Sequence, residues 1–153
     1  FVLTTTGSKM FNRNIDGAGD FVKQGSGTIT LAGNDHAYTG STTVSDGTLV
    51  VTGDIQLSSS ISVASGALLK GTGTVPGGII SGSIRPGTSI GNMTVEGSLT
   101  IEDDATLIIE ISPSDVSTLF VAEDMTIAPN AKLVILPQAG DYEPINHVFL
   151  DVG

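Results

Sequence analysis

Short runs in which aliphatic residues alternate with hydroxyl or small residues recur along the chain, and corners of Gly, Asp and Asn separate them. The clearest copies occupy residues 43–53 and 62–71, nineteen residues apart; both read hydroxyl, aliphatic, two small or polar residues, Gly, small, Leu, aliphatic. Looser copies, each with one extra residue in the turn, occupy residues 100–108 and 126–134. A fixed period near twenty built from short strands is typical of a stacked array, in which each unit buries its apolar face on the next.

The density of strands predicts the geometry of this array. Roughly three strands fit into each period, which predicts an all-β protein and, within that class, a right-handed single-stranded parallel β-helix with three sheets. Residues 25–136 would then hold about five to six coils at about 4.8 Å each, a rod of roughly 25–30 Å. No segment shows a helical period of 3.6 residues over more than a turn or two.

Two sets of residues follow from this interpretation. Aliphatic residues at alternate positions are expected to face the core of the coils: Ile29, Leu31, Val44, Leu49, Val63, Leu68, Val95, Ile101, Leu107, Ile127 and Leu133. Glycines between the runs are expected at corners, where a positive φ or a close approach of two backbones excludes other residues: Gly27, Gly47, Gly66, Gly87 and Gly91.

The pattern also divides the chain. Residues 1–24 are expected to be a lead-in coil that continues from upstream coils, because the chain starts at Phe1 and reads as a fragment of a longer, processed protein. Residues 25–111 form the regular coils. Residues 112–153 are expected to form the last coils, after an insertion at 112–115, with a C-terminal hairpin over residues 140–150 that caps the core.

The charge of the chain is unevenly distributed. The formal net charge is −10, and it lies entirely after Gly91, where eleven acidic residues face Lys132 as the one basic residue. Phosphate binding needs a basic stripe, so a nucleic-acid partner is disfavoured. The absence of cysteine excludes a disulfide framework and a Cys-based metal site, and no cofactor is expected. No run approaches the roughly 18 apolar residues of a transmembrane helix.

Several stretches carry a family resemblance. Residues 22–34, 38–44 and 47–51 resemble the passenger-associated strand repeat of classical (type Va) autotransporters. Residues 71–75 and 84–95 look like the segment that precedes the autochaperone region of those passengers. The later run through Asp115, Leu119, Val121, Leu133 and Tyr142 is similar to that region itself. The resemblance covers about residues 11–150 and departs at 122–124, where the family has a Gly-rich turn.

The resemblance implies a bacterial protein that is exported through the periplasm and across the outer membrane by its own C-terminal β-barrel translocator. This chain would be the membrane-proximal end of the passenger, at the cell surface or secreted, and would contain neither barrel nor linker helix. In this family that end folds first and acts as a template for upstream coils, which suits an array whose non-local pairing is opposed by loop-closure entropy.

Candidate catalytic residues are few. Residues 87–91 fit the G-x-S-x-G nucleophile elbow, but the elbow needs a helix after the serine, and here a strand-like run, 93–95, follows. His147 lies in the expected cap, several coils away. His36 beside Asp35 could form half of an acid–base pair, although a solvent-facing histidine in a turn is the expected state. We therefore expect no enzyme activity in this segment.

Two kinds of ligand site remain to be weighed. Residues 102–104 and 123–124 could stack as a carboxylate ladder that binds calcium through oxygen, although the glycine-rich calcium nonapeptide is absent. Polysaccharide lyases share the β-helix and use clustered acidic and basic residues, but the six basic residues here are dispersed.

Three functional hypotheses stay open at this point. The first is a structural stem and folding nucleus of a passenger whose parent is an adhesin or another virulence factor, with host cells or sister cells as partners. The second is the stalk of a passenger whose upstream domain is an enzyme or toxin. The third is a secreted effector segment that binds a host receptor directly.

Overall fold

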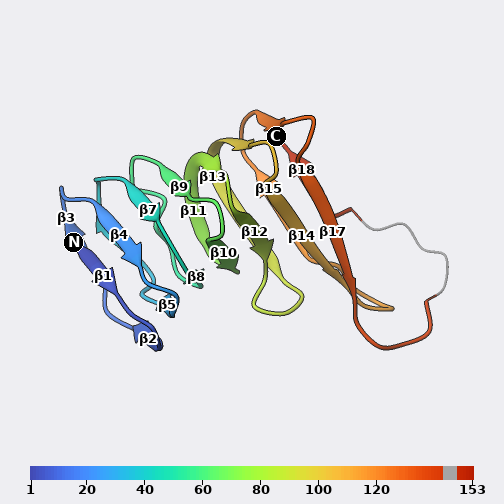
Figure 1. Cartoon of the computed structure of the whole chain (residues 1–153), viewed down its shortest axis with the longest axis horizontal. Coiled ribbons are helices and arrows are strands. Elements are labelled where there is room, and N and C mark those ends of the chain that lie inside the picture. The colour runs from blue at the N-terminus through green and yellow to red at the C-terminus, as the bar shows by residue number, and fades with distance from the viewer. Residues whose placement is uncertain (143–147) are drawn as a thin grey trace.

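The computed structural model describes residues 1–142 and 148–153, and in these residues it contains strands but no helix. The strands lie side by side along the long axis of the molecule, in chain order from one end to the other (Figure 1). All pairings between named strands are parallel. The protein is therefore a parallel β-helix, as the sequence predicts; the number of coils stays a prediction.

Two long sheets form the walls of the solenoid. The first, sheet A, contains β1 (Val2–Thr4), β4 (Phe21–Gln24), β7 (Thr42–Val44), β9 (Ile61–Val63), β11 (Thr74–Ile80), β13 (Asn92–Ile101), β15 (Thr118–Val121) and β18 (Leu150–Val152), with β16 (Met125–Ile127) also beside β13. The second, sheet B, contains β2 (Ser8–Phe11), β5 (Thr28–Leu31), β8 (Thr48–Val51), β10 (Leu68–Gly71), β12 (Ser83–Pro86), β14 (Thr106–Ile111) and β17 (Lys132–Pro137).

The third wall that the sequence predicts is short. It consists of β3 (Asp16–Gly17) and β6 (Ala37–Tyr38), which pair with each other alone among the described strands. Farther along, β11 and β13 run around the corner without a break, and the register between them shifts between Pro76 and Gly78. One continuous strand thus takes the place of two shorter strands separated by a turn.

Alternation along each strand decides which side chains enter the core. In β5 the exposure pattern alternates, with Ile29 and Leu31 buried and the two threonines half-exposed. The register then stacks like on like: Ile29 lies beside Leu49, and Leu49 beside Leu69. Each fully buried aliphatic side chain of this kind stabilises the fold by about 1.5–3 kcal/mol. Most of the expected core residues are buried: Ile29, Leu31, Val44, Leu49, Val63, Val95, Ile101 and Leu107.

Leu68 is an exception, and its assignment to the core is wrong. Leu69 is the buried residue, with 0% exposure, and it pairs with Leu49, whereas Leu68 pairs with Thr48 on the outer face. The turn before β10 holds four residues, 64–67, whereas the turn before β8 holds three, 45–47. One extra turn residue reverses the inward or outward direction of every side chain that follows.

Ile127 and Leu133 face inward but are not buried. They continue the core columns of Ile101 and Leu107, with which they pair, yet they are 52% and 51% exposed. In the described part of the chain no strand stacks on their far side. The expected hairpin cap does not appear among residues 1–142 and 148–153, because β18 pairs in parallel with β15 instead; residues 143–147 of that expectation lie outside the described residues.

Residues 1–24, the expected lead-in, join the stack as a coil in register. β1 pairs with β4, and β2 pairs with β5. The aromatic rings of Phe1, Phe21 and Tyr38 lie next to one another at this end of the core. The ring centroid of Phe21 lies 6.1 Å from that of Phe1 and 6.0 Å from that of Tyr38.

The corner at Gly47 shows why the turns need glycine. Its φ is +68°, and a Cβ there would lie 2.4 Å from the Gly25 carbonyl oxygen and 2.5 Å from that of Gly27. Gly27 itself is packed against the backbone of Gly7, and Gly66 and Gly87 also have positive φ. Gly91 has no positive φ, and a Cβ there would come within 2.9 Å of a Thr72 methyl group.

Candidate functional site

A fully buried lysine occupies the corner below Gly47. Lys23 is 0% exposed, and its Nζ donates hydrogen bonds to three backbone carbonyls, of Gln24 at 3.1 Å, Gly25 at 2.5 Å and Asp46 at 2.8 Å. An ammonium group has three donors, so all of them are used. Burial lowers the pKa of Lys23, and the nearby Asp46 charge opposes that shift. The lysine thus links one corner to the equivalent corner of the next coil.

The sequence contained a pattern that could have identified Lys23. It stands two residues after buried Phe21 and pairs with Val44, which is itself buried, so strict alternation directs it inward. Lysine is almost never fully buried unless its charge has partners, and the carbonyls that accept its hydrogen bonds become visible only in the folded corner.

His36 is buried rather than solvent-facing, which corrects the expectation from its turn. It is 2% exposed, and its Nδ1 accepts a hydrogen bond of 3.0 Å from the backbone N–H of Ile15. The backbone N–H of His36 donates to the Asp54 carbonyl at 3.0 Å. His36 therefore connects three successive coils.

The acid–base pair with Asp35 does not form. Asp35 is exposed, and the Nε2 of His36 is buried without a hydrogen-bond partner among the described residues. Burial lowers the pKa of His36, and the charges of Asp16 and Asp54 act in the opposite direction. Because Nδ1 accepts a hydrogen bond, the neutral ring carries its proton on Nε2.

Three buried hydroxyl groups, of Tyr38, Thr42 and Ser58, form a hydrogen-bonded chain. The Tyr38 and Thr42 hydroxyls lie 2.7 Å apart, Thr42 and Ser58 lie 2.8 Å apart, and Ser58 donates to the Gly40 carbonyl at 2.8 Å. Burial raises the pKa of Tyr38. Buried hydroxyl groups whose hydrogen bonds are satisfied fix a unique packing arrangement, so these three hydroxyl groups have a structural role.

Four of the five carboxylates that could form a calcium ladder, all except Asp124, contact other partners. Glu102 accepts from the Ser81 hydroxyl at 2.5 Å, Asp103 from the backbone N–H of Asn130 at 3.1 Å, and Glu123 from the Ser98 hydroxyl at 3.0 Å. Asp104 forms an ion pair with Lys132 at 3.1 Å, and Glu110 forms one with Arg85 at 2.9 Å. Within the residues that the structure describes, no three acidic, His or Cys side chains converge as metal ligands.

The G-x-S-x-G stretch at 87–91 is a loop between two strands. It connects β12 to β13, with Gly87 at φ +90°, and no helix follows the serine. The Ser89 hydroxyl accepts a hydrogen bond of 3.2 Å from the side-chain amide of Gln138. The strand–turn–helix geometry of a nucleophile elbow is therefore absent here, and His147 lies outside the described residues.

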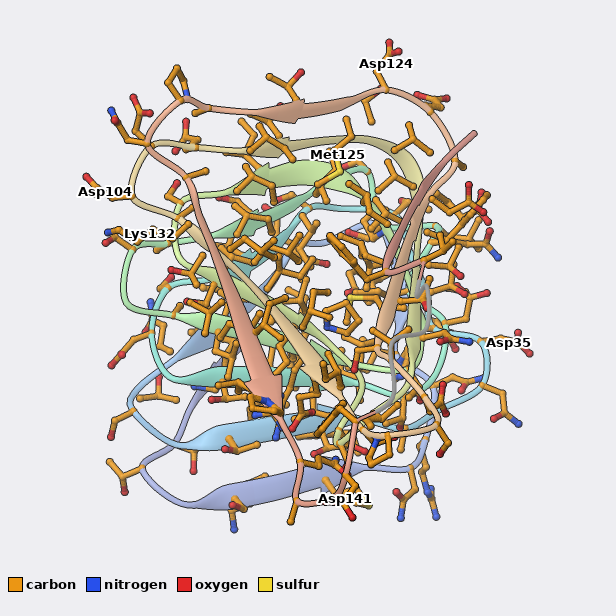
Figure 2. All side chains as sticks on the ribbon, turned by 90° about the vertical axis from the view of Figure 1, so that its right-hand side faces the viewer. Asp35, Asp104, Asp124, Met125, Lys132 and Asp141 are labelled. Atoms are coloured by element: carbon orange, nitrogen blue, oxygen red, sulfur yellow. The ribbon has the colours of Figure 1, made fainter. Side chains whose placement is uncertain are left out.

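An apolar groove opens at the C-terminal end of the solenoid, where the core columns reach the surface. It measures about 210 Å³ and lies between sheets A and B. Its lining consists of Ile101, Leu107, Ile127, Ala131, Lys132, Leu133, Phe149 and Leu150. Figure 2 looks onto this end and shows Asp104, Asp124 and Asp141 at the periphery.

Among the described residues, no helix has the length and apolar character needed to cross a membrane.

Comparison with known proteins gives one family match and two relatives. The sequence model of the Passenger-associated-transport-repeat family matches residues 21–51. The chain is 36% identical over 85 residues to the adhesin BmaC autotransporter of Brucella suis biovar 1 (strain 1330). It is also 36% identical over 87 residues to an extracellular serine protease of Serratia marcescens.

The matches to the two relatives cover about half of this chain but little of the relatives' own length. They span 53% of the chain and 2% of the adhesin, and 56% of the chain and 8% of the protease. The family match begins at β4 and ends with β8, so it includes the Lys23 corner and the hydroxyl chain's first two members.

Proposed function

We propose that this chain, which belongs to the passenger domains of type Va autotransporters, serves as the structural stem and folding nucleus of a passenger that is displayed on the bacterial surface or secreted. The parent protein would be an adhesin or another virulence factor that binds host cells or sister cells. The chain's own outer-membrane β-barrel translocator would be its partner during export.

One observation carries the stem proposal: the core columns and ladders run unbroken from β2 to β17 in sheet B. Each coil is buried by its neighbours, and the polar side chains inside, such as Lys23 and the hydroxyl chain, are mostly occupied with backbone or with one another. A stack of this kind forms a continuous rod, because each coil is held by its neighbours, and it needs no ligand to hold its shape.

The two relatives support a stem in a different way. One is named for adhesion and the other for proteolysis, yet this chain resembles both at 36% identity over similar lengths. A chain that resembles two proteins with different named activities is better suited to a task that both share than to either activity. Holding and folding the rest of a passenger is such a task.

Strand length supports a nucleus in the C-terminal half. No strand before Thr74 exceeds four residues, whereas β11, β13, β14 and β17 span seven, ten, six and six residues. Longer parallel ladders bring more hydrogen bonds for each loop that is closed, so these coils should form first.

Pulse-labelling hydrogen exchange during refolding tests the nucleus. Amides of β13, β14 and β17 should become protected before those of β5 and β8. Protection that arises first in β5 and β8, or at the same time throughout, would contradict a C-terminal nucleus.

A second function, the stalk of a passenger with an upstream enzyme or toxin, is favoured by the resemblance to the serine protease. Either parent would leave this segment without an activity of its own. Beads coated with this chain should then adhere to cultured host cells no better than albumin-coated beads. Specific, saturable adhesion of the coated beads would instead support the third function, direct binding of a host receptor by this segment.

A further inference from the structure

We propose that His36 is the centre of an acid-sensitive joint between three successive coils: below about pH 6.5 the short wall formed by β3 and β6 opens, while sheets A and B stay closed. The inference goes beyond the stem function, because a stem does not have to respond to pH.

The side chain and the backbone of His36 connect three segments of the chain. The Nδ1 atom accepts a hydrogen bond of 3.0 Å from the backbone N–H of Ile15, twenty-one residues earlier. The backbone N–H of His36 donates at 3.0 Å to the Asp54 carbonyl in the next coil. His36 is 2% exposed, so both contacts are made away from water. The histidine therefore holds the corners of three coils together.

A second proton on the ring and the hydrogen bond from Ile15 exclude each other. In the neutral ring Nε2 carries the proton, because Nδ1 is the acceptor. A further proton must bind to Nδ1, which has the remaining lone pair of the ring. Two N–H donors would then face each other across 3.0 Å, and neither could accept. Protonation of His36 thus breaks the contact between its side chain and the preceding coil.

The closed corner leaves no room for the ring to find another partner. Nε2 is buried and has no hydrogen-bond partner among the described residues. A Cβ added to Gly33 would lie 3.0 Å from Nε2, so the ring is packed closely against the backbone of its own segment. A charged imidazolium would therefore be poorly solvated unless the corner opened.

The charges around His36 compensate an imidazolium only in part. The three segments that meet here contain four charged residues: Arg13, Asp16, Asp35 and Asp54. The first three are exposed, and Asp35 points away from the solenoid (Figure 2). The Asp54 carboxylate accepts hydrogen bonds from the backbone N–H and the side-chain amide of Gln56, at 2.8 and 2.7 Å. Burial lowers the pKa of His36, and the charges of Asp16 and Asp54 act in the opposite direction. The ring thus binds a proton more readily in an open corner than in the closed one.

The wall that opens is small compared with the two long sheets. β3 and β6 pair through two residue pairs, whereas the described strands of sheets A and B number nine and seven. The N–H groups of Ala37 and Thr39 donate to the carbonyls of Ile15 and Gly17, at 2.9 and 2.8 Å. Tyr38 stays in place, because its hydroxyl group lies in the buried chain with Thr42 and Ser58. The segment that moves away is therefore residues 12–17, and its release leaves the long ladders intact.

Hydrogen exchange of single amides, followed by NMR in the whole chain between about pH 5 and pH 8, tests the joint. The readout is the protection factor, the ratio of the intrinsic to the observed exchange rate, which removes the pH dependence of the exchange chemistry. The amides of Ile15, Ala37 and Thr39, called here the corner amides, should lose protection about tenfold for each pH unit below 6.5, until the ring titrates in the closed corner as well.

Urea separates local opening from unfolding of the whole chain. A local opening exposes little surface, so exchange of the corner amides should not respond to low concentrations of urea. The amides of Thr48 and Thr52 bond to the preceding coil in sheet B. These two should be more protected than the corner amides at every pH, and their exchange should accelerate with urea.

His36→Gln is the matched variant, because its side-chain oxygen can accept the Ile15 N–H but does not titrate. It keeps the aspartates of the corner, so any pH dependence that these carboxylates cause would persist in it. The protection of its corner amides should be independent of pH. His147→Gln removes the other of the two histidines and should leave the pH dependence of the corner amides unchanged.

A direct measurement on the ring keeps the proposal testable if His36→Gln does not fold. The ¹⁵N chemical shifts of the imidazole, assigned by comparison with His147→Gln, report which nitrogen carries the proton. At neutral pH the proton of His36 should be on Nε2, with Nδ1 unprotonated.

Four results would overturn the proposal. They are a neutral ring with its proton on Nδ1, protection of the corner amides that does not change with pH, the same pH dependence in His36→Gln, and a response of the corner amides to urea equal to that of Thr48 and Thr52. The last result would mean that the solenoid unfolds as a whole. The order of protection during refolding is measured at neutral pH, where His36 is uncharged, so the stem and nucleus proposal fails or stands separately.

Discussion

Leu68 and Leu69 offer a direct test of the register, because identical neighbouring residues face opposite sides of the same strand. Leu69 is 0% exposed and pairs with Leu49 and Ile84, whereas Leu68 is half-buried and pairs with Thr48 and Ser83. Leu69→Ala removes three buried carbon atoms, about 2.4 kcal/mol of transfer free energy at about 0.8 kcal/mol each. The cavity adds to this loss, for a total within about 2–5 kcal/mol.

Leu68→Ala should cost far less, about 1 kcal/mol or below, since that side chain keeps much of its contact with water in the folded state. The measurement is urea unfolding followed by circular dichroism in the β-sheet band, which gives the free energy of unfolding of both variants under the same conditions. Equal slopes against urea are needed for the comparison, because a changed slope signals loss of two-state behaviour.

The aspartate versions sharpen the contrast. Leu69→Asp should fail to fold, because the carboxylate would be buried in an aliphatic column without a partner, whereas Leu68→Asp should fold and resist protease. A Leu68→Ala variant that loses as much free energy of unfolding as Leu69→Ala would show that β10 is shifted by one residue, and the stacking deduced here would be wrong.

Three further changes test the buried corners. Burial lowers the pKa of His36 from 6.5, so as the pH falls the unfolded chain binds a proton at this histidine before the folded chain does. The free energy of unfolding should therefore be highest above pH 6.5 and decrease below it. His36→Gln should flatten that dependence, as measured by urea titrations at several pH values. Lys23→Met leaves three corner carbonyls without their donor and should lower the free energy of unfolding by about 1–3 kcal/mol, whereas Lys70→Met, at a half-buried position, should change it little. Gly47→Ala should cost more than Gly66→Ala in thermal unfolding: both have positive φ, a strain of about 1–3 kcal/mol, but an added Cβ clashes with backbone only at Gly47. A smaller loss for Gly47→Ala than for Gly66→Ala would contradict the close corner.

The sequence allowed the fold class and most core positions to be predicted, because alternation and the period near twenty are local features. Ile29, Leu31 and Leu49 could be assigned inward from their own strands alone. Leu68 could not, because its direction depends on whether the preceding turn holds three or four residues. A repeat alignment treats such a difference as a gap of arbitrary position, while in the folded strand it decides which face each side chain takes.

The buried polar residues were harder to predict for another reason. His36 lies in a turn, and turns are usually solvated, but its Nδ1 is matched by a backbone N–H twenty-one residues earlier. Lys23 is likewise compensated by a carbonyl twenty-three residues later. Partners one coil away along the chain cannot be read from local composition, so burial of these groups emerges only once the coils are stacked.

The longest strand ladders and the excess of negative charge lie in the same part of the solenoid. The excess of ten negative charges lies after Gly91, in the part that contains the ten-residue β13 and the six-residue β14 and β17. Like charges stacked in neighbouring coils repel and oppose the compact state. Stability in a solenoid is approximately the sum of each coil and its interfaces with its neighbours, so the longer ladders offset that repulsion in the same coils where it arises. Removing charge at this end, for example with Asp124→Asn, should therefore raise the free energy of unfolding of these coils.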